Sequence, residues 1–183
     1  MTPEARLALR VALAQSGDRK ALDALLRDHQ RPLYGHVRAI VGDSDLAFDV
    51  LQASLFLVAR RLGGLRDPRW FRAWAFRIAT REAVRAVRRR SRDRARFEDV
   101  DELADVPAEA PVYDPALVRA CADRLDGLPP AAQVVLRLHY LEELTLPEVA
   151  EVLELPLGTV KSRLAYGLAR LRAAIGRGEA SPS

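Results

Sequence analysis

One stretch near the middle of the sequence constrains the fold most, because it cannot contribute to a packed core. Residues 97–115 (FEDVDELADVPAEAPVYDP) hold seven acidic residues and three prolines, with no lysine or arginine. Like charges repel one another and proline resists regular structure, so such a stretch favours an extended tether. We therefore expect a linker at 97–116 between domains at 1–96 and 117–177, with a disordered tail at 178–183.

Composition excludes several classes of protein. Hydrophobic residues make up 49% of the chain and charged residues 30%, which is enough apolar material for a core. The single cysteine, Cys121, cannot close an intrachain disulfide, so a reducing, cytoplasmic setting is expected. His29, His36 and His139 lack the spacing of a metal site, and we expect no metal and no cofactor. No stretch approaches 18 uncharged apolar residues, so no membrane insertion is expected.

Apolar residues on both sides of the acidic stretch return at spacings of three and four, which predicts helices. No run of alternating apolar and polar residues indicates a strand. The expected fold class is all-α, with two small helical domains joined by the acidic flexible linker. One predicted helix spans Trp70 to about Arg92. Its predicted buried face consists of Phe71, Trp74, Ala75, Ile78, Ala79, Val84 and Val87.

A helix-turn-helix is predicted near the C-terminus. Thr145 and Glu148 have the spacing of a capping box, which begins a short helix from Pro147 to about Leu153. The turn Glu154-Leu-Pro follows, and a second helix begins at Gly158. In this motif the second helix enters the major groove of DNA.

The second helix of the motif has one apolar stripe, formed by Val160, Leu164, Leu168 and Leu171, that is expected to pack inward. Lys161 and Ser162 point away from it, with Ala165 and Tyr166 expected next on their face. We expect Lys161 and Ser162 to meet base edges or nearby phosphates, and Arg163 and Arg170 to position the helix on the DNA backbone. The candidate DNA contacts are Thr159, Lys161, Ser162, Arg163, Tyr166 and Arg170.

The segment before the acidic stretch is strongly basic. Residues 60–96 hold fourteen arginines against three acidic residues, and they include Trp70 and Trp74. A basic helix that carries aromatic residues can neutralise phosphates while its rings stack on unpaired bases. Two simpler interpretations stay open. The arginines could form an ordinary solvated face, and at least one tryptophan, Trp74 before Trp70, could belong to the core.

Two blocks of the sequence resemble one family. The segment that ends in GTVKSRL resembles region 4 of the extracytoplasmic-function (ECF) sigma factors; it reads LPPAAQVVLRLHYLEELTLPEVAEVLELPLGTVKSRL. Two upstream segments resemble region 2 of the same family and stand in the same order. They read GDRKALDALLRDHQRPLYGHVRAIVGDSDLAFDVLQASLFLVARRL and WFRAWAFRIATREAVRAVRRR.

The resemblance implies a sigma factor, which directs promoter-specific transcription initiation without chemistry of its own. It implies core RNA polymerase, promoter DNA and an anti-sigma factor as partners. Asp49 and Gln52 would dock on core polymerase, and the C-terminal helix would read the minus-35 element. The minus-10 element would be read by Trp70, Trp74, Arg77, Arg81, Arg85 and Arg88.

The sequence departs from the family pattern within these segments. Ala53 stands where the family usually has a glutamate, and Arg81 and Arg85 replace an asparagine and an aspartate. Glu154 stands where a glycine is common in the turn, and a residue other than glycine adopts such a turn at a conformational cost.

Other functions explain less of the chain. A conventional helix-turn-helix regulator would account only for residues 128–175. An enzyme is the weakest alternative, because the sequence has no glycine-rich phosphate loop and no recognisable nucleophile and base motif. We therefore expect no catalytic residues.

Limited proteolysis tests the predicted division of the chain. Protease should cut first between Phe97 and Pro115, because an extended acidic segment offers its backbone more readily than packed helices do. The products would be two stable fragments, identified by mass spectrometry. Early cleavage inside either flank, with the acidic stretch left intact, would contradict the division.

Overall fold

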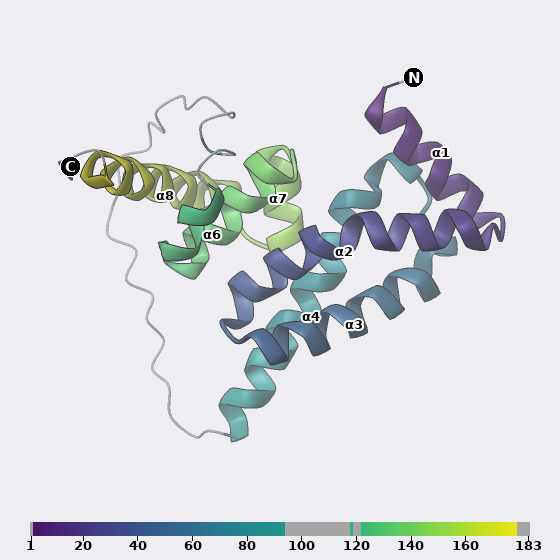
Figure 1. The fold of residues 1–183 in the computed structure, drawn as a ribbon, viewed down its shortest axis with the longest axis horizontal. Helices are drawn as coiled ribbons and strands as arrows, with labels where there is room; N and C mark the ends of the chain where they lie inside the picture. The colour runs from purple at the N-terminus through teal and green to yellow at the C-terminus, as the bar shows by residue number, and fades with distance from the viewer. Residues whose placement is uncertain (1, 94–117, 119–121, 179–183) are drawn as a thin grey trace. The chain divides into compact units, whose positions relative to one another are not determined.

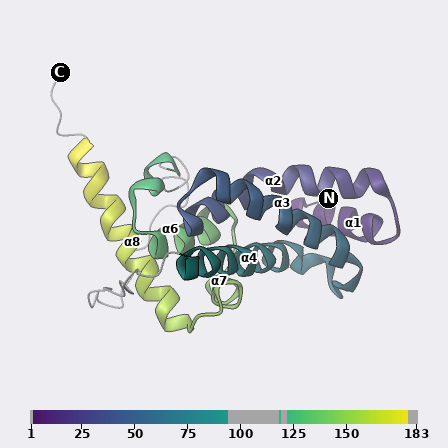
Figure 2. The ribbon, with the colours of Figure 1, turned by 90° about the horizontal axis from the view of Figure 1, so that it is seen from below.

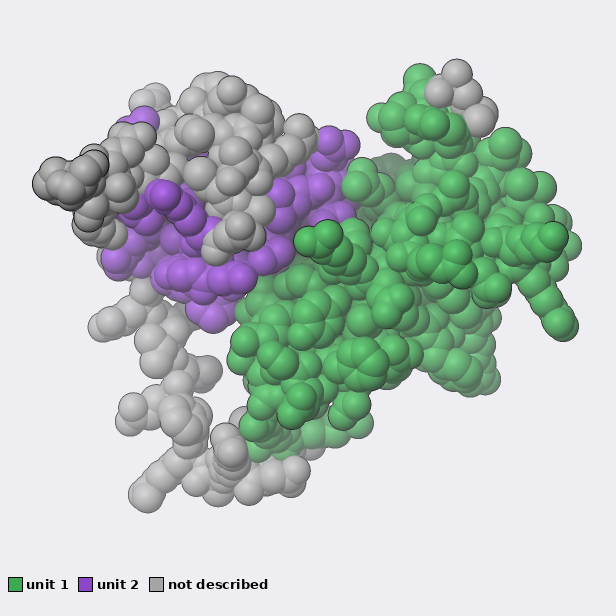
Figure 3. All heavy atoms as spheres, in the orientation of Figure 1, with its two compact units in different colours: residues 1–96 green, residues 97–183 purple. Residues whose placement is uncertain are grey.

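The computed structural model describes residues 2–93, 118 and 122–178. The described residues are helical, without a strand, as the sequence predicts. The chain divides into two compact units, unit 1 at Met1–Arg96 and unit 2 at Phe97–Ser183, coloured separately in Figure 3. The acidic stretch, Cys121 and the end of the predicted tail lie outside the described residues.

Unit 1 contains four long helices, with two short 3-10 helices between the third and the fourth (Figure 1). They are α1 (Pro3–Gln15), α2 (Arg19–Val41), α3 (Ser44–Arg61), η1 (Leu62–Gly64), η2 (Pro68–Trp70) and α4 (Phe71–Asp93). The helices α2, α3 and α4 pack against one another in each pairing, and α1 packs on α2 and η2 (Figure 2). No described helix is long and apolar enough to span a membrane.

Local signals explain where these helices begin and end. The hydroxyl of Thr2 caps α1, and the carboxylates of Asp18 and Asp43 cap α2 and α3. Gly42, with φ of 74°, ends α2 in the left-handed conformation that glycine adopts without penalty. The sequence interpretation did not assign α1, although Thr2 followed by Pro3 is a recognised signal for a helix start.

The core of unit 1 is built around one side of α4. Phe71, Phe76, Ala75 and Ala79 are almost inaccessible to solvent, whereas Val87 is 38% exposed. The prediction that Val87 continues the buried face was wrong, and Val84 is half-buried. In the C-terminal half of α4 the buried positions are Ala83 and Ala86 instead. These small side chains let α4 approach its neighbours closely, and Val87 falls outside the contact.

A polar contact joins α4 to α2 within this core. His36, 1% exposed, lies 2.8 Å through its Nε2 from the hydroxyl of Thr80. That hydroxyl donates to the carbonyl of Phe76, so it accepts from the imidazole. The ring of His36 also meets Phe76 edge to face. His36 is therefore a core residue of unit 1.

Unit 2 consists of short helices packed on one long helix. They are η3 (Ala122–Gly127), α6 (Pro130–Leu136), the π-helical turn η4 (Arg137–Leu141), α7 (Leu146–Leu153) and α8 (Leu157–Gly178). The helices α6 and α8 approach closely at Gly167, where an added Cβ would lie 2.7 Å from a methyl carbon of Leu136. Glycine therefore allows this helix pair to form.

The helices α7 and α8 form the predicted helix-turn-helix. The capping box is complete: Glu148 accepts from the backbone N–H of Thr145 at 2.7 Å, and Thr145 Oγ1 accepts from the backbone N–H of Glu148 at 3.4 Å. The turn begins at Glu154, which is left-handed with φ 57° and ψ 41°. This conformation favours glycine, the residue that the related pattern commonly has there.

Substitutions at Glu154 test this strain. Because Gly removes the Cβ penalty, Glu154→Gly should be more stable than Glu154→Ala by about 1 kcal/mol in urea unfolding. Glu151 is the matched control, since it is an exposed helical residue of α7. There the order should reverse, with Ala more stable than Gly by about 1 kcal/mol. The same order at both positions would show that Glu154 carries no backbone strain.

Candidate nucleic-acid interface

The inner face of α8 is the one predicted from its apolar spacing. Val160, Leu164, Leu168 and Leu171 are each 5% exposed or less. The opposite side carries residues whose spacing places them along one line, which we call the α8 outer stripe. It consists of Thr159, Ser162, Arg163, Tyr166 and Arg170.

Lys161 lies apart from the α8 outer stripe. It is exposed, but two residues beyond Thr159 corresponds to a rotation of about 200° around the helix. The expectation that Ala165 continues the face of Lys161 was wrong, because Ala165 is 3% exposed. Lys161 is therefore exposed near the N-terminal end of α8, whereas the next position along its side is buried.

Side chains of the α8 outer stripe hold one another in place. The Nε of Arg170 donates to the phenol oxygen of Tyr166 at 3.0 Å, and its guanidinium carbon lies 5.3 Å from the ring centroid. The hydroxyl of Ser162 donates to the carbonyl of Thr159 at 3.0 Å. These contacts reduce the rotamer freedom that Arg170 and Ser162 would lose on binding a ligand.

A second basic surface lies on α4. Its exposed arginines recur at spacings of four, four and three residues, so they share one side of the helix. We call these residues the α4 basic stripe: Arg77, Arg81, Arg85 and Arg88. Glu82 lies beside the stripe and pairs with Arg85 at 2.6 Å. Positive charge is therefore dense on this side of α4, and Glu82 supplies a counter-charge at Arg85.

The two tryptophans near the start of α4 differ in their surroundings. Trp70 is 47% exposed, whereas Trp74 packs against the buried cluster that includes Phe71. The interpretation of Trp74 as a core residue fits this packing. Beside Trp70, the carboxylate of Asp67 accepts from the Arg69 guanidinium at 2.7 Å, and this hydrogen bond holds the pKa of Asp67 below its ordinary value.

The exposed side of α3 carries Asp49 and Gln52, together with two aromatic residues that the sequence interpretation missed. Phe48 is 53% exposed and Phe56 is 64% exposed, one turn to either side of Gln52. We call Phe48, Asp49, Gln52 and Phe56 the α3 outer surface. The signal was available in the sequence, because these rings fall off the apolar face of α3. Large apolar residues exposed together mark interaction surfaces.

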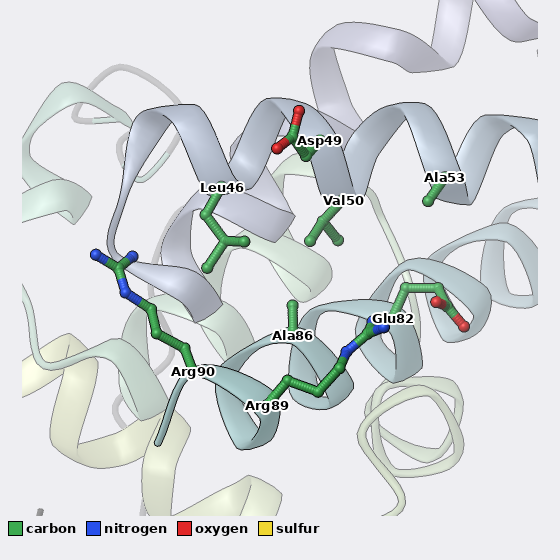
Figure 4. A pocket seen from close by; sticks show the side chains of 8 residues that line it. All are labelled: Leu46, Asp49, Val50, Ala53, Glu82, Ala86, Arg89 and Arg90. Carbon is green, nitrogen blue, oxygen red and sulfur yellow. The ribbon is translucent and has the colours of Figure 1, made fainter. Parts of the chain in front are cut away.

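A hollow of about 380 Å³ lies between α3 and α4, next to the α3 outer surface (Figure 4). Leu46 and Val50 point from α3 towards Ala86, while the carboxylate of Asp49 turns away from α4. At one end Arg90 pairs with Asp43 at 2.9 Å. The backbone N–H of Leu46 and this arginine both lower the pKa of Asp43, and the ion pair links the end of α4 to the start of α3.

No group of three or more histidine, cysteine or acidic residues in the described parts of the chain could hold a metal ion. The surfaces that stand out are instead two basic helix faces and one aromatic-bearing face. They offer charge, hydrogen-bond donors and rings, which are the means of binding nucleic acid and protein.

Two protein families match the two units separately. Residues 25–93 match the family Sigma-70 region 2, and residues 124–173 match Sigma-70, region 4. A stand-alone helix-turn-helix regulator would not explain the match of residues 25–93 to Sigma-70 region 2, so that alternative is not favoured.

Curated relatives match along most of the chain. The RNA polymerase sigma-H factor of Pseudomonas aeruginosa is 30% identical over 84% of this chain and 86% of its own length. The ECF RNA polymerase sigma factor SigM of Mycobacterium tuberculosis is 32% identical over 88% of this chain and 80% of its own. Among solved structures, CnrH in complex with the cytosolic domain of CnrY shares the fold. Its TM-score is 0.61 at 24% identity, covering 93% of this chain and 97% of that one.

The two family matches stand in the same order as the two units, and each match includes the surfaces described above for its unit. Region 2 covers the α4 basic stripe and the α3 outer surface, and region 4 covers the helix-turn-helix. The chain belongs to the extracytoplasmic-function subfamily of sigma-70 factors, which recognise promoters for RNA polymerase.

Proposed function

We propose that each of the three surfaces has one role in transcription initiation. The α4 basic stripe and Trp70 bind the minus-10 element, the N-terminal part of α8 reads the minus-35 element, and the α3 outer surface docks on core RNA polymerase. One observation carries this assignment. A basic helix with an exposed indole and a helix-turn-helix lie on separate compact units of one chain.

The α4 basic stripe suits a DNA strand that has lost its partner. Guanidinium groups neutralise phosphates, and the exposed ring of Trp70 offers a face on which a base can stack. Stacking is available only to an unpaired base. A surface that binds the single strand better than the duplex shifts the equilibrium towards opening, so no catalytic group is required.

The α3 outer surface suits a protein partner. Phe48 and Phe56 supply apolar area, and Asp49 and Gln52 between them supply polar contacts that fix the register. Interfaces commonly derive most of their binding energy from a few such aromatic anchors. Core polymerase is the proposed occupant, because the family places its polymerase contact at the segment DVLQ.

An anti-sigma factor is the second proposed protein partner. CnrH, whose fold this chain shares, was solved in complex with the cytosolic domain of CnrY. A partner that covers the exposed aromatic residues of unit 1 would compete with core polymerase for the same apolar area. The chain would then act by binding alone, in the cytoplasm where polymerase works.

Core docking can be tested with the double variant Asp49→Arg, Gln52→Ala. Its affinity for purified core polymerase should fall at least about tenfold, because two contacts at the centre of the interface are lost. Run-off transcription should fall in parallel and recover when excess variant is added, since only the affinity changes. Asp23→Arg, at an exposed position of α2, is the charge-matched control. Unchanged core affinity of the double variant would refute the assignment.

Reading of DNA by α8 is tested by comparing Lys161→Ala with Arg170→Ala. Lys161 lies near the N-terminus of the recognition helix, where base edges are reached, and Arg170 lies about 13 Å further along the axis. We expect Lys161→Ala to cost about 1 to 3 kcal/mol on a preferred sequence only. Arg170→Ala should weaken binding to all DNA sequences. It should also lower the slope of log affinity against log salt concentration by about one.

The measurement is holoenzyme binding, across a salt series, to a duplex selected from a random pool and to its scrambled counterpart. Lys20→Ala, an exposed lysine of unit 1, controls for loss of one positive charge. Equal losses on both duplexes would make Lys161 a phosphate contact. No loss for either variant would remove α8 from the reading surface.

A further inference from the structure

The helix α1 precedes the segment that matches Sigma-70 region 2, which begins at residue 25. Its last residue, Gln15, nevertheless contacts residues near the middle of that segment. The side-chain Nε2 of Gln15 donates to the carbonyl of Leu62 at 2.9 Å and to the carbonyl of Leu65 at 2.7 Å. One amide group therefore uses both of its N–H donors on the connection between α3 and α4.

At the start of that connection, residues 62–70, Leu62 is buried in the core and Leu65 packs against it, but the two glycines between them are not anchored in this way. Gly63 and Gly64 are exposed, have no side chains to anchor them, and would meet nothing within 4 Å even with an added Cβ. Within the connection, the N–H of Leu65 donates to the carbonyl of Leu62 at 3.0 Å. Two consecutive glycines make a backbone easy to deform, so a side chain that holds both flanking carbonyls limits its movement.

The far end of the connection presents Trp70. The carboxylate of Asp67 accepts from the backbone N–H of Arg69, and the N–H of Trp70 donates to the carbonyl of Asp67. The helix α1 also packs against this turn, η2. Phe71 is 1% exposed, whereas its neighbour Trp70 is 47% exposed. The indole is thus held outward at the point where the connection joins the buried start of α4.

We propose that Gln15 is a positioning residue for promoter opening: its two hydrogen bonds fix the connection 62–70, and so fix Trp70 where it stacks on an unpaired base. This rests on the minus-10 role proposed for Trp70. A base stacks more tightly on a ring that is already held in position, because restricting a mobile ring on binding costs entropy and lowers the affinity. Loss of the Gln15 donor leaves two partly buried carbonyls without this partner and frees the Gly-Gly segment.

The test uses full-length protein and a fluorescein-labelled, ten-nucleotide oligothymidylate as the single-strand probe, with binding followed by anisotropy. Gln15→Met keeps the length of the side chain and removes both donors. It should weaken single-strand binding about fivefold to tenfold, while affinity for core polymerase changes less than twofold. Gln15→Glu places carboxylate oxygens against the two carbonyls and should weaken single-strand binding at least as much. It replaces Gln15→Met in the test if the methionine variant folds poorly.

A double-variant cycle separates positioning from general stability. In a Trp70→Ala background, Gln15→Met should cost less than twofold, because there is no indole left to position. A similar loss in both backgrounds, or a parallel loss of core polymerase binding, would mean that Gln15 only supports the fold and would overturn the inference. Hydrogen exchange of a peptide that spans 62–70 should rise in Gln15→Met while that of α2 does not.

The control is Ser16→Ala, which removes the neighbouring hydrogen bond from Ser16 Oγ to the carbonyl of Leu13 within the end of α1. Single-strand binding should be unchanged in this variant. If Trp70→Ala binds the probe as well as the unaltered protein, the minus-10 role of Trp70 fails and the inference fails with it. If Trp70→Ala loses binding and Gln15→Met does not, the inference alone fails.

Discussion

Burial of one broad side of α4 is the constraint on which unit 1 depends. Phe71 and Phe76 anchor this side, and burial of each such ring stabilises the fold by about 1.5 to 3 kcal/mol. The alanines between and beyond them allow α2 and α3 to come close. The side of α4 that remains in solvent carries the arginines of the α4 basic stripe. Packing and charge therefore determine the exposed face together.

Close helix packing through small residues also determines the fold of unit 2, with different residues. Gly167 lets α6 approach α8, and the leucine stripe of α8 fills the core beneath the helix-turn-helix. The turn at Glu154 then sets the angle between α7 and α8 at the cost of a left-handed residue. A strained residue at this point is tolerated because the capping box and the packing of Val149 and Val152 hold α7 on its other side.

The sequence predicted best what depends on local chemistry. The capping box at Thr145 and the leucine stripe of α8 follow from spacing alone, and both were confirmed. Val87 and Ala165 were placed wrongly, because apolarity does not reveal how wide a contact the neighbouring helices make. The two hydrogen bonds of Gln15 reach Leu62 and Leu65, which follow it by 47 and 50 positions in the sequence. No local pattern indicates such a contact.

Under the proposed function, promoter selection does not require either of the two proposed DNA-binding surfaces to be strong. When one unit is bound, the second binds from an effective concentration set by the length of the chain between them, so modest affinities multiply. That gain is lost when the two DNA elements are wrongly spaced. Glu82, beside the α4 basic stripe, limits the attraction of that stripe for any phosphate backbone. Weak surfaces of this kind discriminate better than strong ones, because nonspecific DNA competes chiefly through charge.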